Sequence, residues 1–166
     1  MRDEAAGLEL GWSWTAGDRG KRKALDKADP AGLFIDRNLQ LLRPGGRLVI
    51  VVPDGILCNS GDAYIREYIM GTKDDATGEF LGGKAIVRAV VGLPERAFSL
   101  AGTDAKTSFI YLQKKRHPAE KQEAIFFAAA EHVGYLKRDK NELPDPMGND
   151  LVEIATQYAA GPKDIR

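Results

Sequence analysis

The sequence predicts an α/β fold with a partial sheet of parallel strands and one antiparallel strand, flanked by helices. The run Leu48–Val52 follows a Pro-Gly-Gly turn and contains no polar residue, which is typical of a parallel strand buried on both faces. Helical patterns precede and follow this strand, and two later strand-like segments have no helix between them. Such an alternation indicates a βαβ unit that an antiparallel strand closes.

The first helix is expected to begin at Pro30 and to end before Pro44. Asp29 is a suitable N-cap, and proline fits the first helical position because its missing N–H needs no partner there. Residues 1–28 show no sustained periodicity, and we expect them to be mostly loop. The apolar side chains expected to face the core are Phe34, Ile35, Leu39, Leu41 and Leu42.

The remaining elements follow from shorter patterns. Asn59 or Ser60 can cap a second helix, in which Ile65, Tyr68 and Ile69 share one face. We expect residues 71–83 to form a surface connection. Strands are expected over 86–93, 107–113 and 125–130, a charged exit from the sheet over 114–118, and a final short helix over 150–159.

Composition limits the class of protein. The 166 residues suffice for one domain, and 24 basic side chains balance 24 acidic ones, so binding to nucleic acid would need a local basic patch. Cys58 is the single cysteine, which excludes an internal disulfide and suits a reducing cytoplasm. No apolar run reaches the roughly 20 residues of a membrane span, so we expect a cytoplasmic protein that does not bind membranes.

Four segments together resemble a known family. Leu33–Leu57, which contains the Leu-Leu-Arg-Pro-Gly-Gly turn, is similar to the second half of the catalytic domain of N6-adenine DNA methyltransferases. Leu93–Ser108, Glu131–Tyr135 and Asn149–Ile154 match later segments of that family, and the nearest members are modification subunits of type I restriction–modification systems. The resemblance implies a partial Rossmann-like sheet of the S-adenosylmethionine-dependent methyltransferases. It divides the chain into a loop-rich segment (1–28), half of the α/β domain (29–117) and an extension with a strand and a short helix (118–166).

Two motifs of that family are missing. No glycine-rich turn follows a strand before Pro44, and no Asn/Asp-Pro-Pro-Tyr/Phe motif is present, since Asp29-Pro30 precedes Ala31 and Asp145-Pro146 precedes Met147. The family uses these motifs to hold S-adenosyl-L-methionine and to grip an adenine flipped out of the duplex. We therefore expect no catalytic residue here, no activity of the chain alone, and the cofactor only in the complete enzyme.

The candidate target-base pocket lies where two strands end. The loop after 86–93 and the loop Pro53-Asp54-Gly55 are expected at the same carboxyl edge of the sheet, where such folds bind ligands. The resemblance implies that Phe98 packs against the flipped adenine, and that Pro53, Asp54 and Gly55 shape the cleft. The alternatives are that Phe98 anchors its own loop and that Pro-Asp-Gly is simply a turn.

Contacts to DNA phosphates are the other binding hypothesis. Thr103 and Lys106 can reach a phosphate from the second loop, although this segment can also be a solvated loop. His117 and His132 lie 15 residues apart with no partnering cysteine or acidic cluster, so no metal site is expected. The densest basic cluster, which contacts DNA or is simply solvated, comprises Arg19, Lys21, Arg22 and Lys23.

These observations predict a truncated or split part of a DNA adenine-N6 methyltransferase. The expected partners are an upstream methyltransferase half or a specificity subunit, and DNA in the assembled complex. One alternative is a non-catalytic interaction or scaffold fragment, which could form homo-oligomers through an exposed sheet edge. The other is a fragment of a methyltransferase that acts on RNA or on a small molecule.

Overall fold

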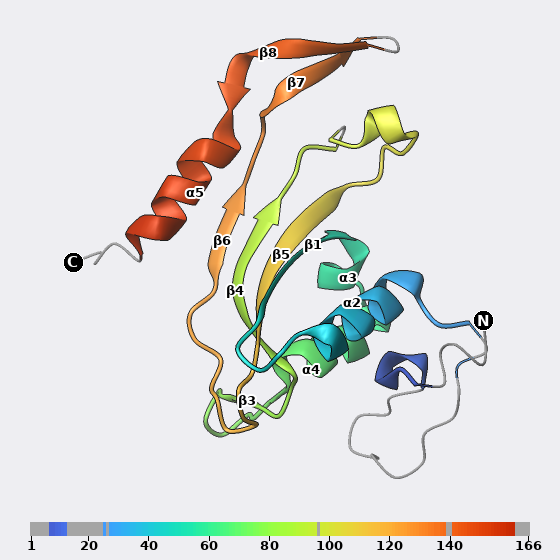
Figure 1. Cartoon of the computed structure of the whole chain (residues 1–166), viewed down its shortest axis with the longest axis vertical. Helices are drawn as coiled ribbons and strands as arrows, with labels where there is room; N and C mark the ends of the chain where they lie inside the picture. The colour runs from blue at the N-terminus through green and yellow to red at the C-terminus, as the bar shows by residue number, and fades with distance from the viewer. Residues whose placement is uncertain (1–6, 13–24, 26, 96, 139–140, 162–166) are drawn as a thin grey trace.

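The centre of the molecule is a four-stranded sheet with the strand order β1-β5-β4-β6 (Figure 1). Both β1 (Arg47–Pro53) and β4 (Ala85–Gly92) pair antiparallel with β5 (Thr107–Lys114), whereas β6 (Phe126–Ala129) pairs parallel with β4. Hence β1, β4 and β6 run in one direction, and the predicted mixture of parallel and antiparallel strands is confirmed. This computed structural model describes residues 7–12, 25, 27–95, 97–138 and 141–161.

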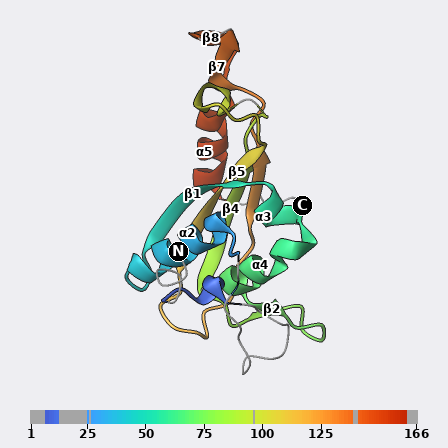
Figure 2. The same cartoon turned by 90° about the vertical axis from the view of Figure 1, so that its right-hand side faces the viewer.

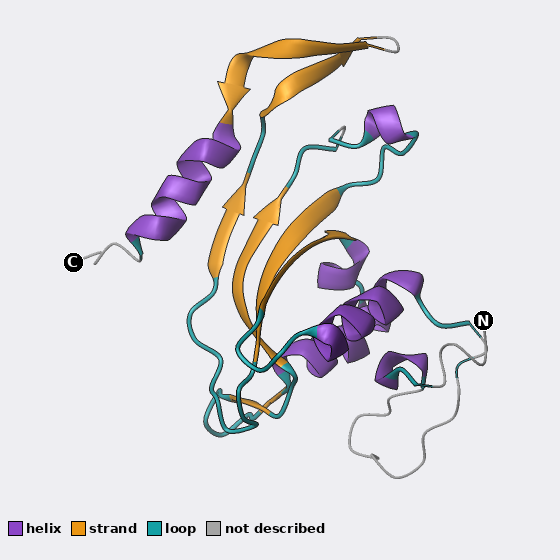
Figure 3. Ribbon diagram, in the orientation of Figure 1, coloured by secondary structure: helices purple, strands orange, loops and turns teal. Residues whose placement is uncertain are grey.

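Helices cover the two faces of the sheet unequally. The face toward α2 (Pro30–Leu41), α3 (Gly55–Cys58) and α4 (Ala63–Met70) contains the main core, while α5 (Asp150–Ala160) packs on the other face beside β6 (Figure 3). The ring of Tyr158 on α5 meets those of Tyr111 and Phe126 edge to face, at centroid distances of 5.9 and 5.5 Å. The predicted final helix is confirmed.

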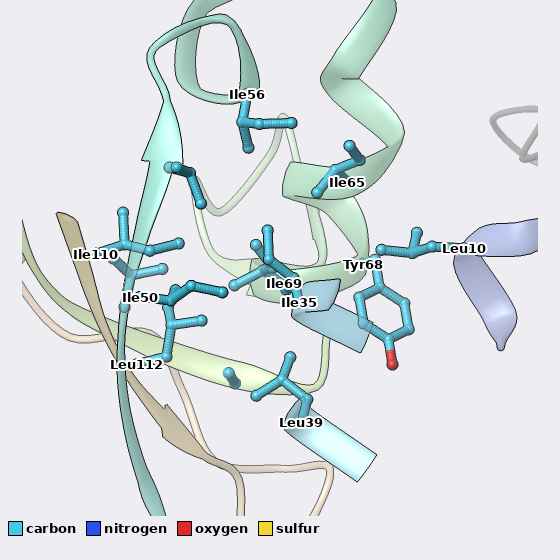
Figure 4. Packing of buried hydrophobic residues seen from close by; sticks show 13 residues of the cluster. Leu10, Ile35, Leu39, Ile50, Ile56, Ile65, Tyr68, Ile69, Ile110 and Leu112 are labelled. Carbon is cyan, nitrogen blue, oxygen red and sulfur yellow. The ribbon is translucent and has the colours of Figure 1, made fainter. Parts of the chain in front are cut away.

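The main core is built from aliphatic side chains of the sheet and of α2 and α4 (Figure 4). Burying each of them contributes roughly 1.5–3 kcal/mol. The 3-10 turn η1 (Glu9–Gly11) adds Leu10 to this core, in a segment that the sequence predicts to be loop. Among the largest side chains that are almost completely buried are Leu10, Ile35, Leu39, Ile65 and Leu112.

Helix α2 begins as predicted. The Asp29 side chain accepts hydrogen bonds from the amides of Ala31 and Gly32 at 2.7 and 3.2 Å, and Pro30 is the first helical residue. At the other end, Lys114 Nζ on β5 donates to the Leu42 carbonyl at 2.7 Å and so ties the helix terminus to the sheet.

The predicted apolar stripe of α2 is only partly correct. Ile35 and Leu39 are buried, but Phe34 and Leu41 are 60% and 71% exposed. These two residues are seven positions apart, which places them together on the helix face away from the core. Leu42 is partly buried against the core.

A buried carboxylate connects η1, α2 and α4 on the side of the sheet that holds the main core. Asp36 on α2 is completely buried, and its Oδ2 accepts a hydrogen bond from the Leu10 amide at 2.9 Å. Its Oδ1 accepts from the Tyr68 hydroxyl on α4 at 2.6 Å and from Gln40 at 3.0 Å. Burial, followed by the hydrogen bond to Asp36, raises the pKa of Tyr68. This network was not predicted from the sequence.

The expectation that Leu48–Val52 is an interior strand buried on both faces is wrong for the described chain. β1 is the last strand of the sheet, and its only strand neighbour among the described residues is β5. Ile50 and Val52 face the helices and are buried, whereas Val49 and Val51 point to the other face and are 62% and 46% exposed. Helix α5 covers the β6 side of that face, which leaves β1 uncovered there.

Other local predictions need correction. Neither Asn59 nor Ser60 caps α4, because the 3-10 turn η2 (Ser60–Asp62) intervenes and the Asn59 side chain donates to Asp62 instead. The expected surface connection over 71–83 contains a short hairpin of β2 (Thr72–Lys73) and β3 (Phe80–Leu81). Within the described residues, no helix combines the length and apolar character needed to cross a membrane.

A second hairpin was not predicted. Strands β7 (Val133–Arg138) and β8 (Asn141–Asn149) pair antiparallel and extend beyond the carboxyl ends of β4 and β6, at the top of Figures 1 and 2. At its root, Asp150 accepts hydrogen bonds from the amides of Glu131 and His132, both at 2.8 Å. His132 Nδ1 lies 2.8 Å from Asp145 Oδ2, and the Asp145 side chain is almost fully buried.

Hydrogen bonds at this root shift the pKa values of its groups. The hydrogen bond with Asp145 raises the pKa of His132 above its ordinary 6.5. The pKa of Asp145 is lowered below 3.8, first by the Met147 amide and then by His132. Backbone amides of His132 and Glu131 likewise lower the pKa of Asp150.

We predict that Asp36→Ala lowers the free energy of unfolding by about 3 kcal/mol, because the Leu10 amide and the Tyr68 hydroxyl both lose their buried acceptor. Urea denaturation followed by circular dichroism measures the change. Asp75→Ala, at an exposed position in the β2–β3 connection, serves as the control. A loss below about 0.5 kcal/mol in Asp36→Ala, the range of ordinary surface substitutions, would show that the network does not stabilise the fold.

We also predict that the stability supplied by His132 depends on pH. Because the folded-state pKa is raised, its contribution is complete below the unfolded value of about 6.5 and is lost as the pH rises through the folded value. Asp145 has the opposite sign, and its contribution is lost as the pH falls through its lowered folded pKa. Urea unfolding from pH 5 to 9 should show wild type and His132→Gln converging at high pH. A gap that is constant over this range would contradict the prediction, and His117→Gln, at an exposed histidine, is the control.

Candidate functional site

The ends of β1 and β4 meet at one edge of the sheet. Ser108 on β5 pairs with Val52 on one side and with Gly92 on the other. The next residue toward the edge, Thr107, pairs with Pro53, and its carbonyl accepts a hydrogen bond from the Leu93 amide at 2.9 Å. The prediction that the loop after β1 and the loop after β4 leave the same carboxyl edge is therefore confirmed.

Asp54 is fixed at this edge by the strand beside it. Its Oδ1 accepts a hydrogen bond from the Ser108 hydroxyl at 2.7 Å, and its amide donates to the Lys106 carbonyl at 3.1 Å. Asp54 also immediately precedes α3, and its carbonyl accepts from the Leu57 amide at 2.9 Å. Asp54 thus joins the start of a helix to the beginning of the neighbouring strand β5, which is more than the simple turn considered from the sequence.

The residues around Asp54 differ in exposure. Pro53 is exposed and Gly55 is half-buried. A side chain at Gly55 would place its Cβ 2.7 Å from Asn59 Nδ2, so a larger residue there needs Asn59 to move. The exposed Cys58 thiol donates to the Asp54 carbonyl at 3.2 Å.

Phe98 lies in the loop that follows β4, directly before the 3-10 turn η3 (Ser99–Ala101). Its side chain is half-buried, whereas Ala97 and Ser99 on either side are buried. Its carbonyl accepts a hydrogen bond from the Ala101 amide at 2.9 Å. Gly102 ends the turn with a φ of 84°, a left-handed conformation that favours glycine. The loop therefore places the partly accessible ring of Phe98 between two buried residues.

The polar part of the same loop reaches toward Asp54. Thr103 and Lys106 are exposed, and the Lys106 carbonyl holds the Asp54 amide. Thr107 is buried, and within the described residues its hydroxyl has no hydrogen-bond partner. The basic cluster Arg19, Lys21, Arg22 and Lys23 lies outside the described residues.

A protein-family model matches most of the chain. Residues 18–164 match the model of the N-6 DNA methylases. The chain belongs to the N-6 DNA methylase family. The predicted resemblance to N6-adenine DNA methyltransferases is confirmed, whereas no curated protein gives a significant match.

Three solved structures share the fold of this chain. A protein assigned as a class I S-adenosylmethionine-dependent methyltransferase from Listeria monocytogenes has a TM-score of 0.56 and 18% identity over 95% of this chain and 37% of that one. A modification subunit assigned to a type I restriction enzyme of Vibrio vulnificus YJ016 has a TM-score of 0.54 and 19% identity, over 83% of this chain and 26% of that chain. A structure of a type I restriction–modification complex has a TM-score of 0.53 and 20% identity, over 82% and 25%.

These comparisons confirm the predicted partial methyltransferase sheet. The chain spans between a quarter and about two fifths of the three matched chains, at 25%, 26% and 37% of their lengths. In the described part of this N-6 DNA methylase chain, no group of three His, Cys, Asp or Glu side chains is arranged to hold a metal ion.

Sequence reasoning identified the two loops but not the residues that join them. Thr107 and Ser108 begin a strand, and the hydrogen bond from Ser108 to Asp54 was not predicted. The available signal was the small polar pair Thr107-Ser108 at the start of an otherwise apolar strand, opposite the expected end of another strand.

Proposed function

We propose that this chain is a truncated or split part of an S-adenosylmethionine-dependent DNA adenine-N6 methyltransferase of the restriction–modification type, inactive alone and located in the cytoplasm. Membership of the N-6 DNA methylase family supports the class of enzyme. The principal structural support is the common carboxyl edge, where Ser108 lies between the end of β1 and the end of β4. Ligand sites of α/β sheets lie at such edges.

Phe98 is proposed to stack on the flipped target adenine. Its half-buried ring, between the buried Ala97 and Ser99, suits a platform that is anchored and still accessible. Stacking of a base on an aromatic ring contributes roughly 1–3 kcal/mol, enough to stabilise an extrahelical adenine. Pro53, Asp54 and Gly55 would form the adjoining wall, with Asp54 oriented by Ser108.

DNA phosphates are proposed to contact the exposed part of the same loop. Both Thr103 and Lys106 are exposed, and the Lys106 carbonyl accepts a hydrogen bond from the Asp54 amide, so a phosphate next to the flipped nucleotide could reach this loop. Arg19, Lys21, Arg22 and Lys23 are proposed as further phosphate contacts because they form the densest basic cluster in the sequence.

The described residues alone do not fit the whole cofactor. S-adenosyl-L-methionine presents a ribose, a charged methionine part and a sulfonium methyl group, whereas the Asp54 carboxylate at this edge already accepts a hydrogen bond from Ser108. No glycine-rich turn follows a strand before β1 in the described chain. We therefore assign cofactor binding to the assembled enzyme and derive no step through it.

The uncovered side of β1 is proposed to receive an upstream methyltransferase half or a specificity subunit. Val49 and Val51 form an exposed apolar pair there, next to a strand edge with unpaired backbone groups in the described chain. The same edge favours a second candidate, a non-catalytic scaffold or homo-oligomer. A methyltransferase fragment acting on RNA or a small molecule remains the third, because the Pro-Gly-Gly strand is common to many methyltransferases.

We predict that the isolated chain gives no measurable heat on titration with S-adenosyl-L-methionine. Binding should appear after mixing with a polypeptide that contains the glycine-rich and Asn-Pro-Pro-aromatic segments. Isothermal titration calorimetry measures both. Affinity of the isolated chain would contradict a divided pocket, and complex formation without cofactor binding would favour the scaffold.

Within such an assembled enzyme, Phe98→Ala should reduce kcat for methylation of duplex DNA by roughly 5- to 150-fold, because one stacking interaction of roughly 1–3 kcal/mol is lost. Radiolabelled methyl transfer measures turnover. Phe127→Ala is the matched control, since it removes an exposed ring from the middle of β6. Unchanged turnover in Phe98→Ala would assign Phe98 to loop packing.

A further inference from the structure

We propose that Tyr135 is a positioning residue for the loop that contains Phe98. Tyr135 lies on β7, and its hydroxyl donates a hydrogen bond to the Ala97 carbonyl, 38 residues earlier in the chain. Ala97 is buried and Tyr135 is half-buried, which protects the bond from competition with water. The consequence for catalysis rests on the proposed function, whereas the consequence for loop structure does not.

The acceptor is well placed to orient Phe98. The Ala97 carbonyl belongs to the same planar peptide unit as the Phe98 amide, so a donor that fixes this oxygen also fixes the plane that leads to the Phe98 Cα. The direction in which the Phe98 side chain leaves the backbone follows from that plane and from φ. Tyr135 can thus fix the orientation of the Phe98 ring without contacting a bound base.

The backbone hydrogen bonds within the loop do not fix its position relative to other elements. The Ala97 amide donates to Pro94 at 3.0 Å, the Ala101 amide to Phe98 at 2.9 Å and the Gly102 amide to Ser99 at 3.2 Å. Each of these bonds closes a turn within the loop, so the loop could move as a unit while keeping all of them. The bond from Tyr135 attaches it to a separate element.

The hairpin is shaped to present Tyr135. The register of β7 and β8 shifts between Val133 and Tyr135, and Gly134 lies between them with a φ of 87°. A Cβ at Gly134 would lie 3.2 Å from the Asn149 side chain, so the position is both strained and crowded for any larger residue. Bulges of this kind change the direction of a side chain on the strand.

The root of the hairpin gives Tyr135 a fixed base. The Ala130 amide donates to the Gly92 carbonyl at 2.9 Å, which joins the end of β6 to the end of β4. Asp150 then holds the amides of Glu131 and His132, and His132 meets Asp145 across the hairpin. The bond at Ala97 therefore connects two segments that both depart from the same end of the sheet.

The first test uses the chain itself and Tyr135→Phe, which keeps the ring and removes the hydroxyl. Amide hydrogen exchange of residues 97–102 should rise about fivefold, the factor that corresponds to one net hydrogen bond of about 1 kcal/mol. Amides of β4 and β5 should be unchanged. Tyr158→Phe is the control, because the contacts of Tyr158 described above are made by its ring. Unchanged exchange over 97–102 would overturn the proposal.

The second test uses the assembled enzyme with duplex DNA containing 2-aminopurine at the target position. Tyr135→Phe should lower kcat and the fluorescence gain that reports base extrusion, with KM for the cofactor unchanged. If Phe98→Ala impairs turnover but Tyr135→Phe does not, the positioning role in catalysis is wrong. If Phe98→Ala has no effect while exchange rises in Tyr135→Phe, the proposed role of Phe98 fails and the loop attachment stands.

Discussion

The insertion of β5 between β1 and β4 is the constraint on which the site depends. An antiparallel strand between two strands of common direction brings both of their carboxyl ends to its own first residues, Thr107 and Ser108. The loop with Asp54 and the loop with Phe98 therefore start within one strand spacing on either side of Ser108, which is about 4.8 Å. No long-range folding of either loop is needed to bring them together. The sheet register alone juxtaposes segments that are far apart in the sequence.

Apolar side chains are distributed unequally between the two faces of the sheet, so one face is well packed and the other is partly exposed. Packing of α2 and α4 against the sheet buries most of the aliphatic side chains, and Asp36 joins η1 to both helices from within that layer. The opposite face has a smaller cluster around Ile154, Val91 and Ala130. Val49 and Val51 stay uncovered on that face of β1. The asymmetry follows from the position of α5 beside β6, and it leaves β1 with an exposed apolar face next to an edge that is free in the described chain.

The sequence was informative where one local pattern has one structural meaning. Asp29-Pro30 specifies a helix start, and the apolar runs after Pro44 and before Pro94 specify strands. It was less informative where the pattern has two meanings, since the run Leu48–Val52 is equally apolar whether its second edge is paired or free. Strands β7 and β8 were not predicted, because Gly134, Pro144 and Gly148 interrupt the alternation of apolar and polar residues that is typical of a strand. Asp36 and Ser108 were missed for a related reason, because a single polar residue does not reveal a partner many positions away.

The two loops of the candidate site are each held by a side-chain hydrogen bond from another element. Ser108 holds Asp54, and Tyr135 holds the peptide before Phe98. A net hydrogen bond stabilises by about 1 kcal/mol, while stacking of one base contributes roughly 1–3 kcal/mol. Under the proposed function, attachments of this size favour one loop position before a base stacks on Phe98, since their energy is comparable with that of the stacking. The two attachments join residues that are distant in the sequence, Asp54 to Ser108 and Ala97 to Tyr135, and so orient both loops relative to the sheet.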